Sequence, residues 1–273
     1  MMEDLTKDEL DTLVGVIRKQ YGYDFTDYAQ ASLKRRFQRF MGHSSIEEVT
    51  ELTERLQQDP DFFLRMAQFI TVNVTEMFRD PVFYKVLREQ VLPRLATWPI
   101  IKIWHAGCAT GEEVFSMIIL LHEAGLLDRC RIYATDLNAA NLDRASKAMI
   151  PLKFMKDYTQ NYLQTGGTED FSNYYTAGDD YAVIRPHLRR NIIFSQHNLV
   201  TDQVFNEFQL ICCRNVFIYF NRQLQNHVLR LFYDSLSPLG YLALGLKESM
   251  MFSEEKNRFE AVSGPHKIFR RKS

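Results

Sequence analysis

The first 95 or so residues carry hydrophobic positions at the spacing of amphipathic helices. A capping box, Thr6–Glu9, precedes one hydrophobic stripe that ends at Gly22, and a second stripe runs from Leu33 to Met41. The spacing of Ser45–Glu48 predicts a further capped helix. No pattern typical of strands occurs before Trp98. The sequence therefore predicts an all-helical N-terminal part.

Two Asp-Pro pairs predict two more helices in this part. Asp59 and Asp80 would each be an N-cap, because an aspartate side chain accepts backbone N–H bonds and proline fits the first helical position. The two helices would then begin at Pro60 and Pro81.

From Trp98 onward, short apolar runs alternate with helical patterns. A helix is predicted from Glu112 to about Ala124, and Asn221 would cap another that runs through Ser235. The apolar runs predict strands at residues 100–103, 131–135, 191–195, 209–213, 240–245 and 266–269. This alternation predicts an α/β fold, with a parallel sheet and helices on both faces.

Residues 153–190 do not fit the alternation. The stretch holds Gly166, Gly167, Gly178 and five tyrosines, with little helical periodicity, and we expect an inserted small β subdomain or a long ordered loop. The predicted division is an N-terminal helical domain over residues 1–85, a linker over 86–97, and a sheet domain over 98–273 that carries the insertion.

Composition and charge narrow the function classes. The chain has 273 residues, of which 46% are hydrophobic, and a formal net charge of -1. No overall field would attract nucleic acid or a membrane. None of the four cysteines lies in a C-x-x-C pair, so no metal site is expected. The chain starts without a basic-then-apolar leader, and its best apolar run, Val114–Leu121, is too short to span a bilayer. We expect a cytoplasmic protein and, by default, a monomer.

The first strand-to-helix turn of the sheet domain contains Gly107 and Gly111. Ligands of such sheets bind at the carboxyl ends of the strands. The turn lacks the G-x-G-x-x-G pattern of dinucleotide binders, which argues against a nicotinamide oxidoreductase. Glu112 and Glu113 follow at once. They would repel a phosphate and suit a cationic ligand, although acids are also ordinary in the first turn of a helix.

Asp136 ends the second predicted strand. An acid at this place can accept hydrogen bonds from the hydroxyls of a ribose, although it could equally be the N-cap of the next helix. A glycine turn, acids after it and a strand-end acid together describe a site for a cationic nucleoside. S-adenosylmethionine, with its sulfonium, ammonium and ribose, fits that description.

Three further segments lie beside this predicted site. Arg214 to Asn221 follow the fourth strand, Asn73 to Arg79 lie at the junction of the helical part and the sheet, and Gln196 to Leu199 follow the third strand and could touch the ligand's base. Ordinary loop polarity, a surface ion pair of Arg79 and a structural His197 are the alternatives for these segments.

Five strings in these segments resemble the chemotaxis receptor methyltransferases of the CheR type. In chain order they read N-V-T-E-M-F-R, G-C-A-T-G-E-E, A-T-D-L-N, H-N-L and C-R-N-V-F-I-Y-F. The first and last are quite specific to that family, and the resemblance runs from about residue 5 to the C-terminus. It implies a Rossmann-like class I methyltransferase sheet with a small inserted β subdomain, preceded by an all-helical domain that contacts receptors.

The resemblance also implies a reaction and its residues. The family transfers a methyl group from S-adenosylmethionine to glutamate side chains of chemoreceptors, giving glutamyl methyl esters and S-adenosylhomocysteine. By motif, Arg79 and Tyr219 would be catalytic. The cofactor would be bound by Asn73, Thr75, Arg79, Ala106, Glu112, Asp136, Asn198, Leu199 and Asn215.

The second predicted helix carries Lys34, Arg35, Arg36 and Arg39, and no acidic residue lies between Asp27 and Glu47. This charge would suit docking on an acidic receptor helix bundle, although a solvated helix face is the alternative. The resemblance favours docking.

Three alternatives and one departure from the family remain. A methyltransferase for nucleic acid is disfavoured because no D/N-P-P-Y motif follows the fourth strand, and a methyltransferase for a small molecule or another protein carboxylate stays open. A regulator that binds S-adenosylmethionine without transfer is a further possibility. Family members that dock on a receptor's C-terminal pentapeptide have a short glycine-bounded turn in the β subdomain. The segment here is longer, so we expect no pentapeptide tethering.

Overall fold

The computed structural model describes residues 5–21, 23–70 and 75–273. Contacts group the chain into two units. The helical unit comprises residues 1–73 together with 217–228, and the sheet unit comprises residues 74–216 and 229–273. The segment 81–95, which the sequence analysis divided between the helical domain and the linker, belongs to the sheet unit and is itself helical.

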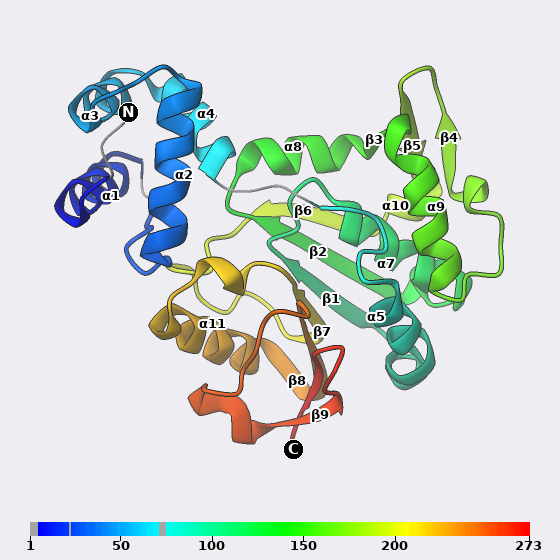
Figure 1. The fold of residues 1–273 in the computed structure, drawn as a ribbon. Coiled ribbons are helices and arrows are strands. Elements are labelled where there is room, and N and C mark those ends of the chain that lie inside the picture. Colours follow the sequence, from blue (N-terminus) through cyan, green and yellow to red (C-terminus); the bar gives the residue numbers. More distant parts are fainter. Residues whose placement is uncertain (1–4, 22, 71–74) are drawn as a thin grey trace. The chain divides into compact units, whose positions relative to one another are not determined.

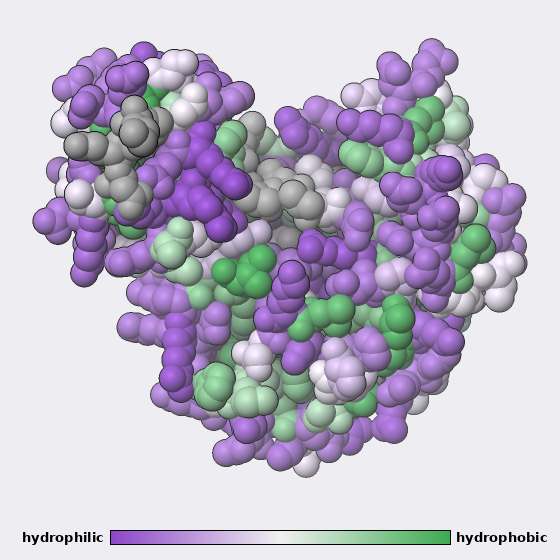
Figure 2. Space-filling view, viewed as in Figure 1, coloured by the Kyte–Doolittle hydropathy of each residue, from purple (hydrophilic) through white to green (hydrophobic). Residues whose placement is uncertain are grey.

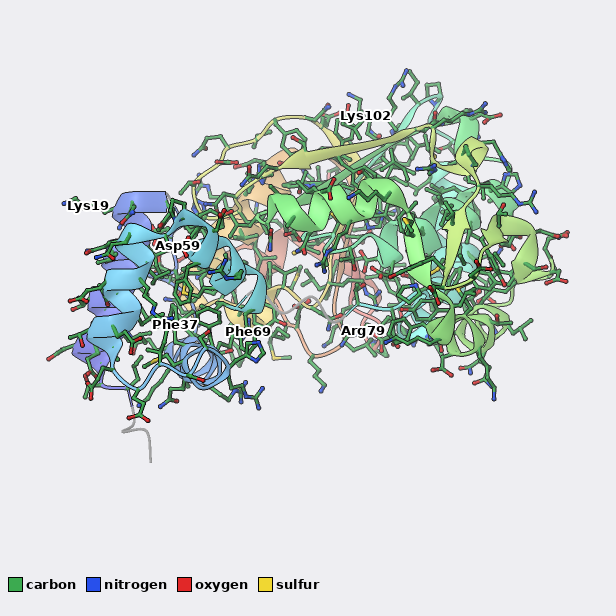
Figure 3. The ribbon with its side chains drawn as sticks, turned by 90° about the horizontal axis from the view of Figure 1, so that it is seen from above. Lys19, Phe37, Asp59, Phe69, Arg79 and Lys102 are labelled. Atoms are coloured by element: carbon green, nitrogen blue, oxygen red, sulfur yellow. The ribbon has the colours of Figure 1, made fainter. Side chains whose placement is uncertain are left out.

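The helical unit is built from amphipathic helices around one core. Four helices, α1 to α4, span Lys7–Tyr21, Gln30–His43, Val49–Gln58 and Pro60–Ile70. Leu13, Ile17, Phe37 and Leu52 are completely buried in the core, and Figure 3 labels Phe37 among these helices. The described residues before Trp98 contain no strand, as predicted.

Two of the three predicted helix caps in this unit form as expected. The Thr6 N–H donates to Glu9 Oε2 (2.7 Å), and the Glu9 N–H donates to Thr6 Oγ1 (3.3 Å). Asp59 accepts from the Phe62 N–H at 2.9 Å, ahead of α4. The box predicted at Ser45–Glu48 is wrong. Ser45 has a left-handed backbone (φ 55°) in the turn after α2, and α3 begins only after Glu48, without a side-chain cap.

The sheet unit contains a seven-stranded sheet of order β6-β2-β1-β7-β8-β10-β9. Its strands β1, β2, β6, β7, β8, β9 and β10 span Ile101–Ala106, Cys130–Asp136, Ile192–Gln196, Phe208–Cys213, Leu236–Leu244, Phe259–Ser263 and Ile268–Arg271. The strands from β6 to β8 run parallel, whereas β10 and β9 are antiparallel. The predicted parallel sheet is therefore confirmed for five strands, and two antiparallel strands extend it at one edge. We did not predict β9, a short edge strand in which only Phe259 is buried.

Helices cover the faces of this sheet, as Figure 1 shows. They include α5, α6, α7, α8 and α11, which span Pro81–Val86, Leu92–Leu95, Glu112–Glu123, Ala139–Lys147 and Arg222–Ser235, and a π-helical turn at Leu87–Val91 joins α5 to α6. Helix α7 is buried along Val114–Leu121, which explains its apolar run. Asn221 caps α11 as predicted, because its Oδ1 accepts from the Leu224 N–H at 2.9 Å. No helix in the described ranges is both long and apolar enough to cross a bilayer.

The insertion begins earlier than predicted and is partly helical. Strands β3, β4 and β5 (Met149–Pro151, Tyr175–Ala177 and Tyr181–Ile184) form an antiparallel sheet of order β3-β5-β4. Helices α9 and α10 span Met155–Gln164 and Pro186–Arg189, with 3-10 turns at Leu152–Phe154 and Phe171–Tyr174. The sequence analysis missed α9, because its buried residues, Met155, Tyr158 and Tyr162, include few aliphatic side chains. The small β subdomain itself is confirmed.

Candidate active site

The glycine turn connects β1 to α7 with three left-handed residues. Gly107, Ala109 and Gly111 have φ values of 77°, 48° and 97°. A Cβ on Gly107 would lie 2.6 Å from Val216 Cγ2, and one on Gly111 would lie 2.8 Å from the Phe115 ring. Glycine is therefore required at both ends of the turn by backbone conformation and by space.

Asp136 closes the turn from the end of β2. Its Oδ2 accepts from the Ala109 N–H (2.9 Å), and its Oδ1 accepts from the Asn138 N–H (2.9 Å) and Asn141 Nδ2 (3.1 Å). The N-cap of α8 is Asn138, whose Oδ1 accepts from Ala140 N–H, so the alternative that Asp136 is that cap is wrong. Burial raises the pKa of Asp136, although these hydrogen bonds oppose the shift. Three bonds leave this carboxylate about one of four lone-pair positions for a ligand.

Glu112 is the first residue of α7 and is 9% exposed. Its Oε2 accepts from Thr110 Oγ1 at 2.6 Å. Burial raises the pKa of Glu112, and the bond from Thr110 opposes that shift. The backbone carbonyl of Glu112 accepts from Ser116 Oγ, which in turn accepts from the Phe78 N–H; both distances are 2.8 Å. The segment before α5 is thus hydrogen-bonded to the first turn of α7.

Arg214 is the buried centre of an ionic network at the end of β7. Its guanidinium contacts Glu113 Oε2 (3.1 Å), Asp80 Oδ2 (2.8 Å) and the carbonyl oxygen of Arg79 (3.1 Å), and it lies 4.0 Å from the centre of the Phe83 ring. Helix α5 begins at Pro81 as predicted. The carboxylate of Asp80 does not cap that helix, because it is bonded to Arg214 instead.

Glu113 belongs to the same network, since its Oε1 lies 2.8 Å from His105 Nδ1. Burial by itself would raise the pKa of Glu113, but the bonds and charges of His105 and Arg214 outweigh it, so the pKa lies below its ordinary value. The expectation that both acids after the turn suit a cationic ligand is therefore wrong for Glu113. Of the two acids, Glu113 is paired with Arg214, whereas the carboxylate of Glu112 is bonded to Thr110.

Asn215 follows Arg214 in a left-handed conformation (φ 63°). Its N–H donates to Glu248 Oε2 (3.1 Å), which also accepts from the Gly245 N–H (2.5 Å). Sequence analysis missed Glu248, a buried carboxylate that fixes two loops at the carboxyl ends of β7 and β8. The only signal was an acid placed shortly after an apolar strand.

Asn198 and Leu199 lie in the turn after β6. The Asn198 N–H donates to Asp202 Oδ2 (2.9 Å), and its Oδ1 accepts from the Val200 N–H (3.0 Å), while Leu199 is buried. His197 packs edge-on against Trp104 with ring centres 5.1 Å apart. Burial lowers the pKa of His197. These contacts agree with the structural role that was the alternative for this histidine.

The structure gathers part of the predicted site at one edge of the sheet. Ala106, Glu112, Asp136, Asn198 and Asn215 all lie at or just beyond the carboxyl ends of parallel strands. Thr75 and Arg79 lie in the segment before α5, within the sheet unit. Figure 3 labels Arg79. Asn73 lies outside the described residues.

The remaining predicted residues belong to the helical unit. Tyr219 lies in the 3-10 turn Phe217–Tyr219. Lys34, Arg35, Arg36 and Arg39 lie on α2, where the surface is strongly hydrophilic in Figure 2. Arg35 and Arg39 are exposed. Arg36 instead lies over the ring of Tyr219, with its guanidinium carbon 4.1 Å from the ring centre.

One group of side chains among the described residues has the geometry of a metal site. Donor atoms of His105, Glu113 and Cys212 lie within 4.8 Å of one another. The group fits a cation poorly, because Arg214 already binds the same carboxylate and burial raises the pKa of the Cys212 thiol. We therefore assign this cluster to the ionic network.

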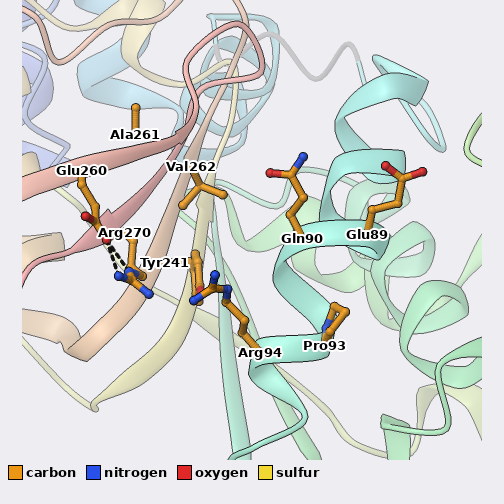
Figure 4. A pocket seen from close by; sticks show the side chains of 9 residues that line it. All are labelled: Glu89, Gln90, Pro93, Arg94, Tyr241, Glu260, Ala261, Val262 and Arg270. Carbon is orange, nitrogen blue, oxygen red and sulfur yellow. Dashed lines mark hydrogen bonds and ion pairs between the residues drawn. The ribbon is translucent and has the colours of Figure 1, made fainter.

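A cavity of about 500 Å³ lies away from the carboxyl ends of the strands. Figure 4 shows Arg94 extending toward Tyr241, next to the ion pair of Arg270 with Glu260. None of the predicted site residues lines this cavity. It is therefore separate from the candidate site.

Comparisons with known proteins agree with this geometry. Two family descriptions match the chain: "CheR methyltransferase, SAM binding domain" over residues 73–268 and "CheR methyltransferase, all-alpha domain" over residues 8–71. The chain is 47% identical to Cher3 of Pseudomonas putida, over 96% of both chains. The name of that relative gives methyltransferase activity only as an assignment still to be proved. The chemotaxis protein methyltransferase of Listeria innocua is 32% identical, over 92% of this chain and 93% of its own. The chain belongs to the CheR methyltransferase family and is a Rossmann-like, S-adenosylmethionine-dependent methyltransferase.

Proposed function

We propose that this protein methylates glutamate side chains of chemoreceptors, giving glutamyl methyl esters and S-adenosylhomocysteine. One observation carries the proposal most directly. Arg214 binds the backbone of Arg79 and the side chains of Asp80 and Glu113, so it fixes the Arg79 segment at the same sheet edge as the glycine turn and Asp136. Arg79, the proposed cation for the substrate carboxylate, would then belong to the same site as Asp136 and Glu112, the proposed acids for the cofactor.

A glutamate is a suitable acceptor for a site of this composition. Its reference pKa is about 4.3, so it is an oxygen nucleophile at neutral pH without a general base. His105 is not placed to act as such a base, because it is buried and bonded to Glu113. The reaction then requires in-line alignment and exclusion of water more than proton transfer.

S-adenosylmethionine, when bound, supplies an electrophilic methyl group on a cationic sulfur. Asp136 has acceptor capacity left for a ribose hydroxyl, and Glu112 lies at the start of α7 for the ammonium group. Asn198 and Leu199 would flank the adenine, and the turn at Ala106, together with Asn73 and Thr75, would complete the site. Asn215 would lie near the transferred methyl group.

Arg79 and Tyr219 would direct the substrate. The guanidinium of Arg79 would hold one oxygen of the substrate carboxylate, which leaves the other free to attack. Tyr219 would orient the same carboxylate through its hydroxyl. In the transfer, the attacking oxygen forms a bond to the methyl carbon, and the electron pair of the breaking carbon–sulfur bond goes to sulfur.

The test is methyl transfer from radiolabelled S-adenosylmethionine to a purified receptor cytoplasmic fragment from the same organism. We expect label that base releases as methanol, as an ester requires, and its loss in Arg79→Ala. Arg94→Ala is the matched control, because Arg94 is exposed and lines the separate cavity. Base-stable label would instead indicate another acceptor. Binding of S-adenosylhomocysteine without any transfer would favour a regulator.

We further propose that receptor docking uses α2 and does not require a C-terminal pentapeptide. This part of the proposal rests on the length of the whole segment between α9 and β5, residues 165–180, which includes a 3-10 turn and β4; within it, β4 and β5 are joined by the short turn 178–180. Titration with such a pentapeptide should give no binding at micromolar concentrations. Micromolar affinity would overturn this part of the proposal.

A further inference from the structure

Arg36 is held on both sides in the helical unit. Its guanidinium stacks on one face of the Tyr219 ring, with 4.1 Å between the guanidinium carbon and the ring centre, and its Nη1 donates to the carbonyl oxygen of Ile70. Arg36 is only half-buried, but both contacts use the charged end of the side chain. Arg35 and Arg39 on the same helix are exposed. The four basic residues of α2 are therefore not equivalent.

The backbone around Tyr219 is bonded to the residues that precede α2. The Ala29 N–H donates to the Tyr219 carbonyl oxygen (2.8 Å), and the Asn221 N–H donates to the Asp27 carbonyl oxygen (2.8 Å). Tyr28 and Phe220 pack edge to face, with ring centres 5.3 Å apart. Gln30, the first residue of α2, follows directly. The basic helix and the tyrosine are thus parts of one packed unit.

This arrangement restricts what Tyr219 can do. An arginine over one ring face fixes the plane of the ring, and this contact does not use the hydroxyl. The positive charge also adds to the attraction for a carboxylate that approaches the hydroxyl.

We propose that Arg36 is a positioning residue for methyl transfer, which acts by fixing the Tyr219 ring, and is not a receptor-docking residue. The proposal rests on the proposed function, since it needs Tyr219 to orient the substrate glutamate. Arg36 then acts on turnover, whereas Arg35 and Arg39 act on receptor association. A receptor that shifts α2 on docking would also shift the ring.

The experiment compares Arg36→Met with Arg39→Met in the full-length protein, by steady-state methylation of the receptor fragment at several salt concentrations. For Arg36→Met we expect about a tenfold lower kcat, corresponding to the loss of a partly buried cation–π contact. Its receptor KM, the salt dependence of that KM and its affinity for S-adenosylhomocysteine should stay near wild type. For Arg39→Met we expect a raised, less salt-dependent KM and an unchanged kcat.

A double-mutant cycle separates positioning from general damage. In a Tyr219→Leu background, Arg36→Met should lower kcat no further, because the ring through which it acts is gone. Arg36→Lys, which keeps the charge but lacks the planar group, should restore only part of kcat and serves as the measured variant if Arg36→Met does not fold. Additive effects on kcat, or a raised KM with normal kcat in Arg36→Met, would overturn the positioning role alone. A wild-type protein that forms no base-labile methyl ester would overturn the proposed function and this inference together.

Discussion

The guanidinium of Arg214 donates to the carbonyl oxygen of Arg79 across 3.1 Å, although the two residues are 135 positions apart in the chain. Through this bond, the residue that follows β7 fixes the backbone of the residue expected to hold the substrate. The side chain of Arg214 is only 1% exposed, so this residue supports the site from the protein interior.

Arg214→Met should destabilise the protein by about 3–5 kcal/mol, because it leaves Glu113 and Asp80 without their buried cation. Activity should fall more than the affinity for S-adenosylhomocysteine, since the Arg79 backbone loses its donor. Urea unfolding and methyl transfer measure the two effects. Arg190→Met is the control, because its pair with Asp128 is exposed on both sides and should contribute about 0–1 kcal/mol. Equal losses in both variants would contradict the role of the network.

Gly107→Ala should abolish cofactor binding. The substitution combines a left-handed backbone with a Cβ placed 2.6 Å from Val216 Cγ2. Gly125→Ala separates the two effects, because Gly125 also has a positive φ (66°) but no atom within 4 Å of its Cβ position. We expect that control to cost about 1 kcal/mol in stability and to leave binding intact. Isothermal titration with S-adenosylhomocysteine measures the binding of each variant, and urea unfolding measures its stability. Adding Val216→Ala to Gly107→Ala should partly restore binding, because it removes the Cγ2 atom that the new Cβ would meet.

Cofactor affinity should depend on pH through Asp136 and Glu112. Burial raises the pKa of both carboxyls above their reference values of 3.8 and 4.5. A cationic ligand prefers the deprotonated forms. On acidification, the affinity of the ligand should therefore begin to fall at a pH above those reference values. Titrations with S-adenosylhomocysteine from pH 7.5 downward test this. Affinity that stays constant to below pH 4.5 would contradict it.

The contribution of Glu113 to the stability of the fold should also be lost in acid. The pKa of this carboxyl is lowered in the folded protein relative to its reference value of 4.5. Its stabilising contribution is therefore present above about pH 4.5 and is lost as the pH falls through the lower folded-state pKa. Glu113→Gln should be less stable than wild type at neutral pH, and the difference should shrink in acid. If the difference in stability between Glu113→Gln and wild type did not change with pH, the loss would come from packing and not from the charge of Glu113.

Asp136→Asn should weaken S-adenosylhomocysteine binding by about 10- to 100-fold, the loss expected when a hydrogen bond to a charged acceptor becomes neutral. The amide also replaces one acceptor of the Ala109 N–H with a donor, which disturbs the glycine turn. Asp143→Asn on the exposed face of α8 is the matched control. Calorimetry distinguishes them, and similar affinities in both variants would remove Asp136 from the ribose site.

Local patterns predicted the helices α1, α2 and α4, the five parallel strands and the glycine turn, because each of these has its signal within a few residues. The roles of Asp80, Glu113 and Glu248 could not be predicted, since their partners lie 134, 101 and 33 positions away. Asp80 even had a convincing local assignment as a helix cap. Tertiary pairing with Arg214 overrode it.

The segment 217–228 limits how the helical unit can be exchanged between relatives. It leaves the sheet unit after Val216, packs with residues 27–29 and returns to the sheet unit within α11. A chimera that exchanges only the first 70 residues with those of a relative would place foreign side chains against Tyr219 and Asn221. A functional exchange of the helical unit therefore requires two grafts, because this unit is built from two separate segments of the chain.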